Sequence, residues 1–75
     1  MKHFWRIECE HSPETIDRIL IPIRKRGLTV VNLHYIQGVD RTATCVIELE
    51  HDTVDTERIF KNLLRTIHIH NIIKL

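Results

Sequence analysis

Apolar and polar residues alternate along residues 3–10 and again along residues 42–50. A period of two places successive side chains on opposite faces, so each stretch predicts a strand with one buried face. The side chains expected to point inward are Trp5, Ile7, Cys9, Ala43, Cys45, Ile47 and Leu49. Residues 68–75 predict a short final strand.

Residues 28–36 are rich in β-branched and aromatic side chains, which favour an extended backbone, and predict a further strand. Its more apolar face is expected to carry Val31, Leu33 and Tyr35, and its other face Val30, Asn32 and His34. Residues 37–40 contain glycine and aspartate and predict the turn that leads into the next strand.

A helix is predicted where apolar residues recur at i, i+3, i+4 and i+7, which makes one apolar stripe. These residues are Ile16, Ile19, Leu20 and Ile23. Ser12 is a good N-cap, Pro13 fits the first helical position, and Gly27 favours a left-handed stop. Pro22 removes a hydrogen bond inside this helix at about 3 kcal/mol, which predicts a kink or a tightened last turn.

A second helix is predicted before the final strand, with Asp52 or Thr53 as its N-cap. Its apolar stripe consists of Phe60, Leu63, Leu64 and Ile67, flanked by Ile59. The order strand, helix, strand, strand, helix, strand predicts one α+β domain over residues 1–75, a ferredoxin-like βαββαβ sandwich. We expect a four-stranded antiparallel sheet with both helices on one face, and the strand over residues 28–36 at an edge.

Composition narrows the class of protein. The chain has 75 residues, 43% of them hydrophobic, and a net charge of +1, which argues against a disordered tail. No apolar run is long enough to span a membrane, and Arg6 and Glu8 interrupt any export signal, so a cytoplasmic domain is expected. Near-neutral charge and the acids Glu8 and Glu48 on the expected central strands argue against nucleic-acid binding.

Six histidines and two cysteines are the candidates for metal chemistry. His68 and His70 are two apart and would share a face of a strand, where they could hold a metal. The sequence offers no further ligand at suitable spacing, so we expect surface histidines and no metal site. Cys9 and Cys45 fit apolar core positions and not a disulfide framework. No nucleophile–base set, glycine-rich loop or carboxylate pair predicts catalysis.

The loop before the first helix leads directly into a helix N-terminus, whose free N–H groups could accept a carboxylate. Glu14 lies in this first turn, where it stabilises the helix and competes with any bound anion. The alternative interpretation of the same residues is simply a good helix cap.

Residues 12–20, SPETIDRIL, and residues 24–28, RKRGL, resemble the beginning of the ACT domain in small subunits of acetolactate (acetohydroxyacid) synthase. That family shows an arginine before two aliphatic residues, then Arg-Gly before an aromatic or aliphatic residue. Here these are Arg18-Ile19-Leu20 and Arg26-Gly27-Leu28. The second half agrees without gaps, including residues 44–50 and 71–75, so the resemblance covers nearly the whole chain.

The resemblance implies a non-catalytic regulatory subunit of branched-chain amino-acid biosynthesis. The partner would be the catalytic large subunit of acetolactate synthase, which holds thiamin diphosphate, FAD and Mg²⁺, while the small subunit itself needs no cofactor. Family members dimerise through their ACT domains and bind an amino-acid effector between the domains. Carried onto this chain, the effector-binding residues would be His11, Ser12, Glu14, Thr29 and Val30, and the dimer edge would hold Val30, Asn32 and His34.

Three positions depart from the feedback-sensitive pattern of the family. That pattern has Asn at the position of His11, Gly at Glu14 and Asn at Thr29. Glycine would let a ligand carboxylate approach the backbone closely, whereas Glu14 fills the space and adds negative charge. The sequence therefore favours an activating subunit with little or no valine response. The alternatives are a stand-alone ACT-type sensor of another small molecule and a histidine-based metal-binding module.

Overall fold

Six elements follow one another in the computed structural model, which describes residues 2–50 and 56–75. They are the strands and helices β1 (Lys2–Glu10), α1 (Thr15–Lys25), β2 (Thr29–Gln37), β3 (Thr42–Glu50), α2 (Thr56–Leu64) and β4 (Ile69–Lys74). Their order and approximate bounds confirm the sequence prediction. No helix within the described residues is both long and apolar enough to cross a membrane.

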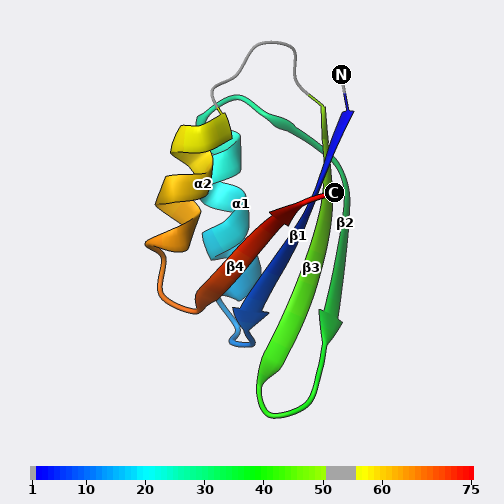
Figure 1. Cartoon of the computed structure of the whole chain (residues 1–75), viewed down its shortest axis with the longest axis vertical. Coiled ribbons are helices and arrows are strands. Elements are labelled where there is room, and N and C mark those ends of the chain that lie inside the picture. The colour runs from blue at the N-terminus through cyan, green and yellow to red at the C-terminus, as the bar shows by residue number, and fades with distance from the viewer. Residues whose placement is uncertain (1, 51–55) are drawn as a thin grey trace.

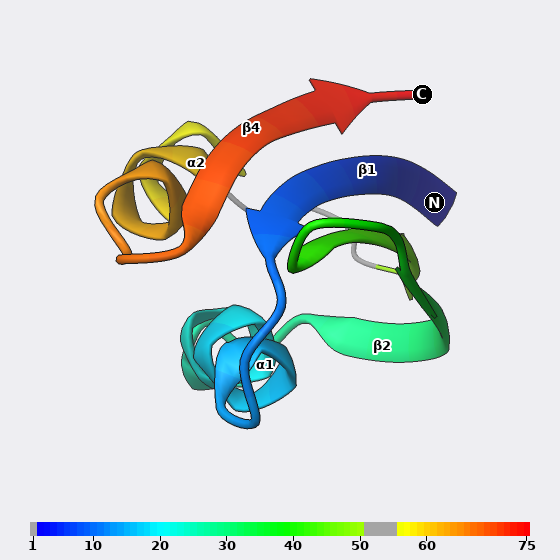
Figure 2. The same cartoon turned by 90° about the horizontal axis from the view of Figure 1, so that it is seen from below.

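The four strands form one antiparallel sheet in the order β2-β3-β1-β4, and both helices cover the same face of it (Figures 1 and 2). This is the predicted ferredoxin-like βαββαβ fold. β1 and β3 are central, whereas β2 lies at one edge, as expected, and β4 at the other. The opposite face of the sheet carries no helix (Figure 2).

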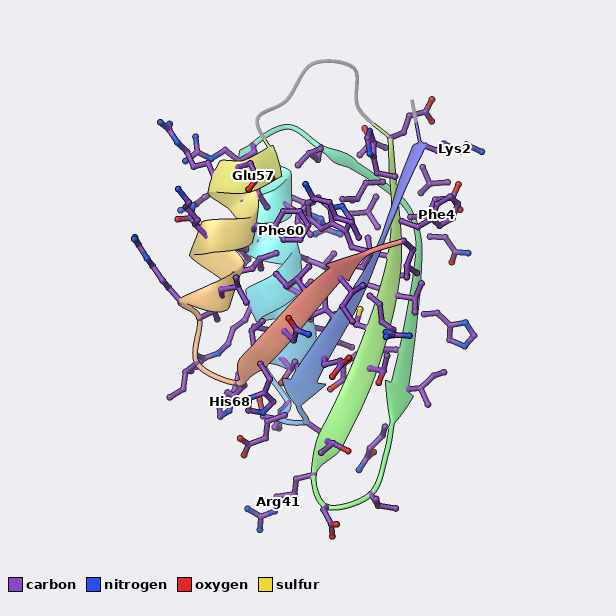
Figure 3. All side chains as sticks on the ribbon, in the orientation of Figure 1. Lys2, Phe4, Arg41, Glu57, Phe60 and His68 are labelled. Atoms are coloured by element: carbon purple, nitrogen blue, oxygen red, sulfur yellow. The ribbon has the colours of Figure 1, made fainter. Side chains whose placement is uncertain are left out.

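The core lies between the sheet and the helices. Its buried side chains from the sheet are Trp5, Ile7, Cys9, Ala43, Cys45, Ile47, Leu49 and Ile69, and those from the helices are Ile19, Ile23, Ile59, Phe60 and Leu63. Leu28, in the connection between α1 and β2, completes the core. Every residue predicted to point inward from β1 and β3 is among them. The ring of Trp5 packs against that of Phe60, with centroids 4.4 Å apart and the ring planes tilted by 38°, so the largest side chain of β1 holds α2 against the sheet. Phe60 is labelled on α2 in Figure 3.

The start of α1 differs from the prediction. The helix begins at Thr15, and Glu14 is the N-cap residue without a side-chain capping bond, so Ser12 and Pro13 lie before the helix rather than in it. Thr15 is fully buried, whereas Ile16 and Leu20 are only half-buried. The stripe that faces the core is therefore Thr15, Ile19 and Ile23, which also follows helical spacing.

The end of α1 follows the prediction at Gly27. Gly27 has a φ of 77°, its N–H donates to the carbonyl of Arg24, and the N–H of Leu28 donates to the carbonyl of Ile23. This pair of bonds around a left-handed glycine is a Schellman motif. The helix continues through Pro22 to Lys25, so the proline does not end it.

A β-bulge in β2 overturns the predicted division of its side chains. Val30 pairs with Leu49 and Asn32 pairs with Glu48, so Val31 is an extra residue without a partner on β3. Val30 consequently packs against the core together with Leu33 and Tyr35, and Val31 is 47% exposed. The pattern alone could not locate the bulge, because a bulge is defined by the pairing with β3.

Two residues of the predicted α2 stripe are exposed. Leu64 is the last helical residue and Ile67 lies beyond it, and their exposed fractions are 49% and 64%. The core side of α2 is formed by Ile59, Phe60 and Leu63. The helix ends before it can bring Ile67 round to the sheet. The predicted N-cap residues, Asp52 and Thr53, lie outside the described residues.

Candidate functional site

The loop between β1 and α1 is organised around the buried hydroxyl of Thr15. Its Oγ1 donates to the carbonyl of Glu10 at 2.9 Å and accepts the backbone N–H of Ser12 at 3.0 Å. Ser12 Oγ lies 2.9 Å from the same atom and 3.4 Å from a carboxylate oxygen of Glu14. One side chain of the helix thereby fixes the loop that the sequence analysis selected as a binding site.

His11 connects this loop to β2. Its Nδ1 lies 2.9 Å from the hydroxyl of Tyr35, and the two rings are tilted with centroids 5.7 Å apart. The backbone N–H of His11 donates to the carbonyl of Arg41 in the β2–β3 hairpin. His11, Ser12 and Glu14 therefore form one cluster at the end of β1, held by Thr15 and Tyr35.

Burial controls the acid–base properties of the three titratable groups beneath this cluster. Burial raises the pKa of Tyr35, and the thiol of Cys9 adds to this increase. Burial also raises the pKa of Cys9, and it raises the pKa of Cys45 to about 12. Both thiols are free and stay protonated at neutral pH, so they act as small apolar core groups and not as nucleophiles.

Thr29 and Val30 lie far from this cluster within one chain. Thr29 pairs with Glu50, which also pairs with Lys2, so Thr29 lies where β1 begins. The other end of β1, at Glu10, lies eight residues further along an extended strand, which is a separation of about 25 Å, and His11 follows directly after it. Figure 1 shows the same arrangement, with the β1–α1 loop and the α1–β2 connection at opposite ends of the molecule.

The three residues predicted for a dimer edge do not share a face of β2. Val30 points toward the helices because of the bulge, whereas Asn32 and His34 lie on the face without helices. There they line a shallow hollow of about 210 Å³ together with Phe4, Ile36, Val46 and Glu48. All three residues nevertheless belong to an edge strand.

The two C-terminal histidines are placed apart. His68 precedes β4 with a φ of 81° and its Nδ1 lies 3.6 Å from a carboxylate oxygen of Glu10 (Figure 3). His70 falls at a register shift in β4 and is exposed beside Arg6 and Glu8. No group of three or more His, Cys, Asp or Glu side chains suited to a metal occurs among residues 2–50 and 56–75.

The loop cluster offers several hydrogen-bonding groups. A helix N-terminus without a side-chain cap, two hydroxyls, an imidazole and a phenol can orient a small polar ligand by hydrogen bonds. Sequence reasoning selected His11, Ser12 and Glu14 but missed Thr15 and Tyr35. Helical spacing could have identified Thr15, because it lies four residues before Ile19 on the core stripe.

Comparison with known proteins shows the fold. No protein-family model and no curated protein matches the chain by sequence. Among solved structures, the ACT domain of a GTP pyrophosphokinase from Chlorobium tepidum aligns with a TM-score of 0.82 at 16% identity, over 100% of this chain and 97% of that one. The C-terminal domain of the MgtC protein from Mycobacterium tuberculosis aligns with a TM-score of 0.76 at 16% identity, over 99% and 84%.

A formyltetrahydrofolate deformylase from Pseudomonas putida KT2440 contains the same fold as one part of a longer chain. The TM-score is 0.83 at 11% identity, over 100% of this chain and 28% of that one. Similarities at such low identity establish shared architecture. The chain therefore has the fold of an ACT domain.

Proposed function

We propose that this chain is a non-catalytic regulatory domain that works as a dimer and holds a small-molecule site between its two copies. More specifically, we propose the activating small subunit of acetolactate synthase, with little or no response to valine. The ACT-type fold supports the general proposal. The resemblance of residues 12–20 and 24–28 to synthase small subunits supports the specific one.

The observation that carries the proposal is the separation of the two halves of the predicted site. His11 and Ser12 lie beside the end of β2, whereas Thr29 and Val30 form its beginning. An antiparallel pairing of two β2 edges about a two-fold axis would bring the beginning of one strand next to the end of the other. The loop of one copy would then meet Thr29 and Val30 of the second copy, and each dimer would hold two equivalent sites.

The proposed weak valine response follows from the electrostatics of the loop. The carboxylate of Glu14, the N-cap residue of α1, lies 3.4 Å from Ser12 Oγ, where the carboxylate of an amino-acid ligand would bind. Two carboxylates at one helix N-terminus repel each other, and the side chain also blocks close approach to the backbone. Activation of the synthase does not need this pocket to be filled.

The test is the activity of the catalytic large subunit from the same genome, measured with and without this protein and with and without excess valine. We expect clear activation that valine does not change, and sedimentation analysis should give a dimer. Activation abolished by valine would refute the role assigned to Glu14 but keep the subunit assignment. Absence of activation would refute the subunit assignment.

A stand-alone sensor of another small molecule is the second candidate. The likeness to ACT-type domains from proteins as different as a pyrophosphokinase and a deformylase favours it, because the fold occurs in unrelated settings. Dimerisation together with binding of a different small molecule, without activation of the synthase, would favour this candidate.

A further inference from the structure

The charges of this nearly neutral chain are distributed unevenly over its two faces. The segments that contain the helices, residues 14–27 and 56–66, carry seven of the eleven lysines and arginines and three acids. Four glutamates of the central strands β1 and β3 lie on the sheet face that no helix covers. They are Glu8, Glu10, Glu48 and Glu50. The helix segments, residues 14–27 and 56–66, therefore form a basic helix layer, although the net charge of the chain is only +1.

The cations of the helix layer have no carboxylate partners within the described part of the chain. The ion pairs there join Lys2 to Glu48, Arg6 to Glu8, Lys74 to Glu57 and His68 to Glu10. None involves a lysine or arginine of the two helix segments. Unpaired like charges on one surface repel each other, so an external anionic group that approached them would be attracted and would relieve this repulsion.

A groove of about 590 Å³ runs through this layer between the two helices. Ile21, Pro22, Lys25 and Arg26 line it from α1 and its C-cap, and Asn62 and Thr66 line it from α2 and the turn that follows. No acidic side chain is among the lining residues.

The apolar lining of the groove comes from Ile21 and Pro22 of α1. Ile21 is 53% exposed, and Pro22 stands beside it inside the helix without a backbone N–H. An exposed isoleucine and a proline surrounded by lysine, arginine, an amide and a hydroxyl have the composition of a protein interface, with an apolar centre and a polar rim. Arginine at such positions contributes strongly to binding.

We propose that the α1–α2 groove is the docking surface for an acidic segment of the protein that this domain regulates. Lys25 and Arg26 on the α1 wall select carboxylates, and Ile21 with Pro22 receives an apolar side chain of the same segment. This inference rests on the proposed function, because a regulatory domain needs a surface for its partner. The groove lies on the helix layer, so docking there leaves the β2 edge and the β1–α1 loop accessible.

The geometry favours a protein segment over a small anion. The groove is open, and its cations, Lys25 and Arg26, stand on flexible side chains rather than on the backbone N–H groups of a tight loop. Phosphate and carboxylate sites for small molecules use such rigid donors, because a small ligand cannot offset the ordering of several long side chains. A segment that contacts both walls makes enough contacts to do so.

The experiment measures binding of this protein to the catalytic large subunit of acetolactate synthase from the same genome, at low and at high salt. The groove variant combines K25E with R26E, and K25Q with R26Q repeats the test without charge reversal. The control variant combines R24E with K61E, which makes the same change of net charge on exposed helix positions that do not line the groove. Circular dichroism and sedimentation verify that each variant is folded and assembled like the wild type.

We expect the groove variant to bind at least about tenfold more weakly than the wild type at low salt, and the control variant to change by less than about threefold. The wild-type affinity should fall as salt rises, because screening weakens exposed charge pairs. Ile21→Ser should also weaken binding, and this loss should persist at high salt.

The outcomes separate the two proposals. Wild-type binding that the groove variants leave unchanged would overturn the docking surface and keep the proposed function. An equal loss in the control variant would show a diffuse charge effect, which also overturns the groove. Absence of wild-type binding would overturn both proposals, because the domain would then not act on this partner.

Discussion

Replacement of Thr15 by valine tests whether one buried hydroxyl organises the β1–α1 loop. Valine has nearly the shape of threonine, so the change leaves the packing of α1 intact and removes only the hydroxyl. It leaves the carbonyl of Glu10 and the N–H of Ser12 without their partner at 2.9 and 3.0 Å. The hydroxyl of Ser12 also loses its contact with Thr15, but water can replace that contact. The loss of stability therefore comes mainly from the two backbone groups.

The expected loss of stability is about 2 kcal/mol, at about 1 kcal/mol for each partly buried group that loses its hydrogen bond. A domain of this size has a total stability of only about 4 to 11 kcal/mol, so the effect is large. It corresponds to a decrease of the melting temperature by about 10 °C. Thr15→Ser keeps the hydroxyl and loses one methyl group, so it should cost about 1 kcal/mol.

Urea unfolding followed by tryptophan fluorescence measures these free energies, because Trp5 is buried in the core. The wild type, Thr15→Val and Thr15→Ser are compared at one pH and protein concentration. A valine variant within about 0.5 kcal/mol of the wild type would refute the argument, since a hydroxyl whose removal costs so little does not hold the loop. A serine variant less stable than the valine variant would show that packing outweighs the hydrogen bonds.

Three further predictions concern pH, the ligand loop and the end of α1. The pKa of Cys45 is about 12 in the folded protein against an ordinary value of 9.0, so the unfolded chain loses this proton first and stability should fall as pH rises from 9 towards 12. Wild type should lose about 1.4 kcal/mol more per pH unit than Cys45→Ala in this range, and equal slopes in urea unfolding would contradict the assignment. Glu14→Gly should tighten valine binding by at least about tenfold in calorimetry, because it removes a competing carboxylate. An unchanged affinity would disprove the proposed repulsion between Glu14 and the carboxylate of valine. Gly27→Ala should lower the free energy of unfolding by about 1 kcal/mol, because alanine is strained at the φ of 77° that Gly27 adopts. A Cβ at this position meets no atom within 4 Å, so no steric clash adds to the loss. An unchanged free energy of unfolding would show that the left-handed turn carries no strain.

The sequence by itself determined the elements whose signals are local. Alternation identified β1 and β3 and the side chains they bury, because side-chain direction in a strand depends only on position along it. Gly27 identified the end of α1, since a left-handed residue strongly favours glycine. The order of elements then left the βαββαβ sandwich as the arrangement in which both helices cover one sheet face.

Only the tertiary structure decided the features that depend on a partner element. The bulge at Val31 arises from pairing with β3, and it turned Val30 inward against the expected alternation. Thr15 follows the helical spacing of the core stripe, but its hydrogen bond to the carbonyl of Glu10 joins two elements, and periodicity cannot reveal that partner.

The predicted site and the basic helix layer also depend on contacts between elements that are far apart in the sequence. His11 and Thr29 were grouped by family resemblance. The fold places them at opposite ends of the sheet, because β1 and β2 run in the same direction and His11 follows the end of β1 whereas Thr29 begins β2. The net charge of +1 did not reveal the basic helix layer, because net charge adds the cations of the helices to the acids of the sheet, and folding places these two groups on opposite faces. Local sequence thus determined which elements form, and the contacts between them determined which residues meet.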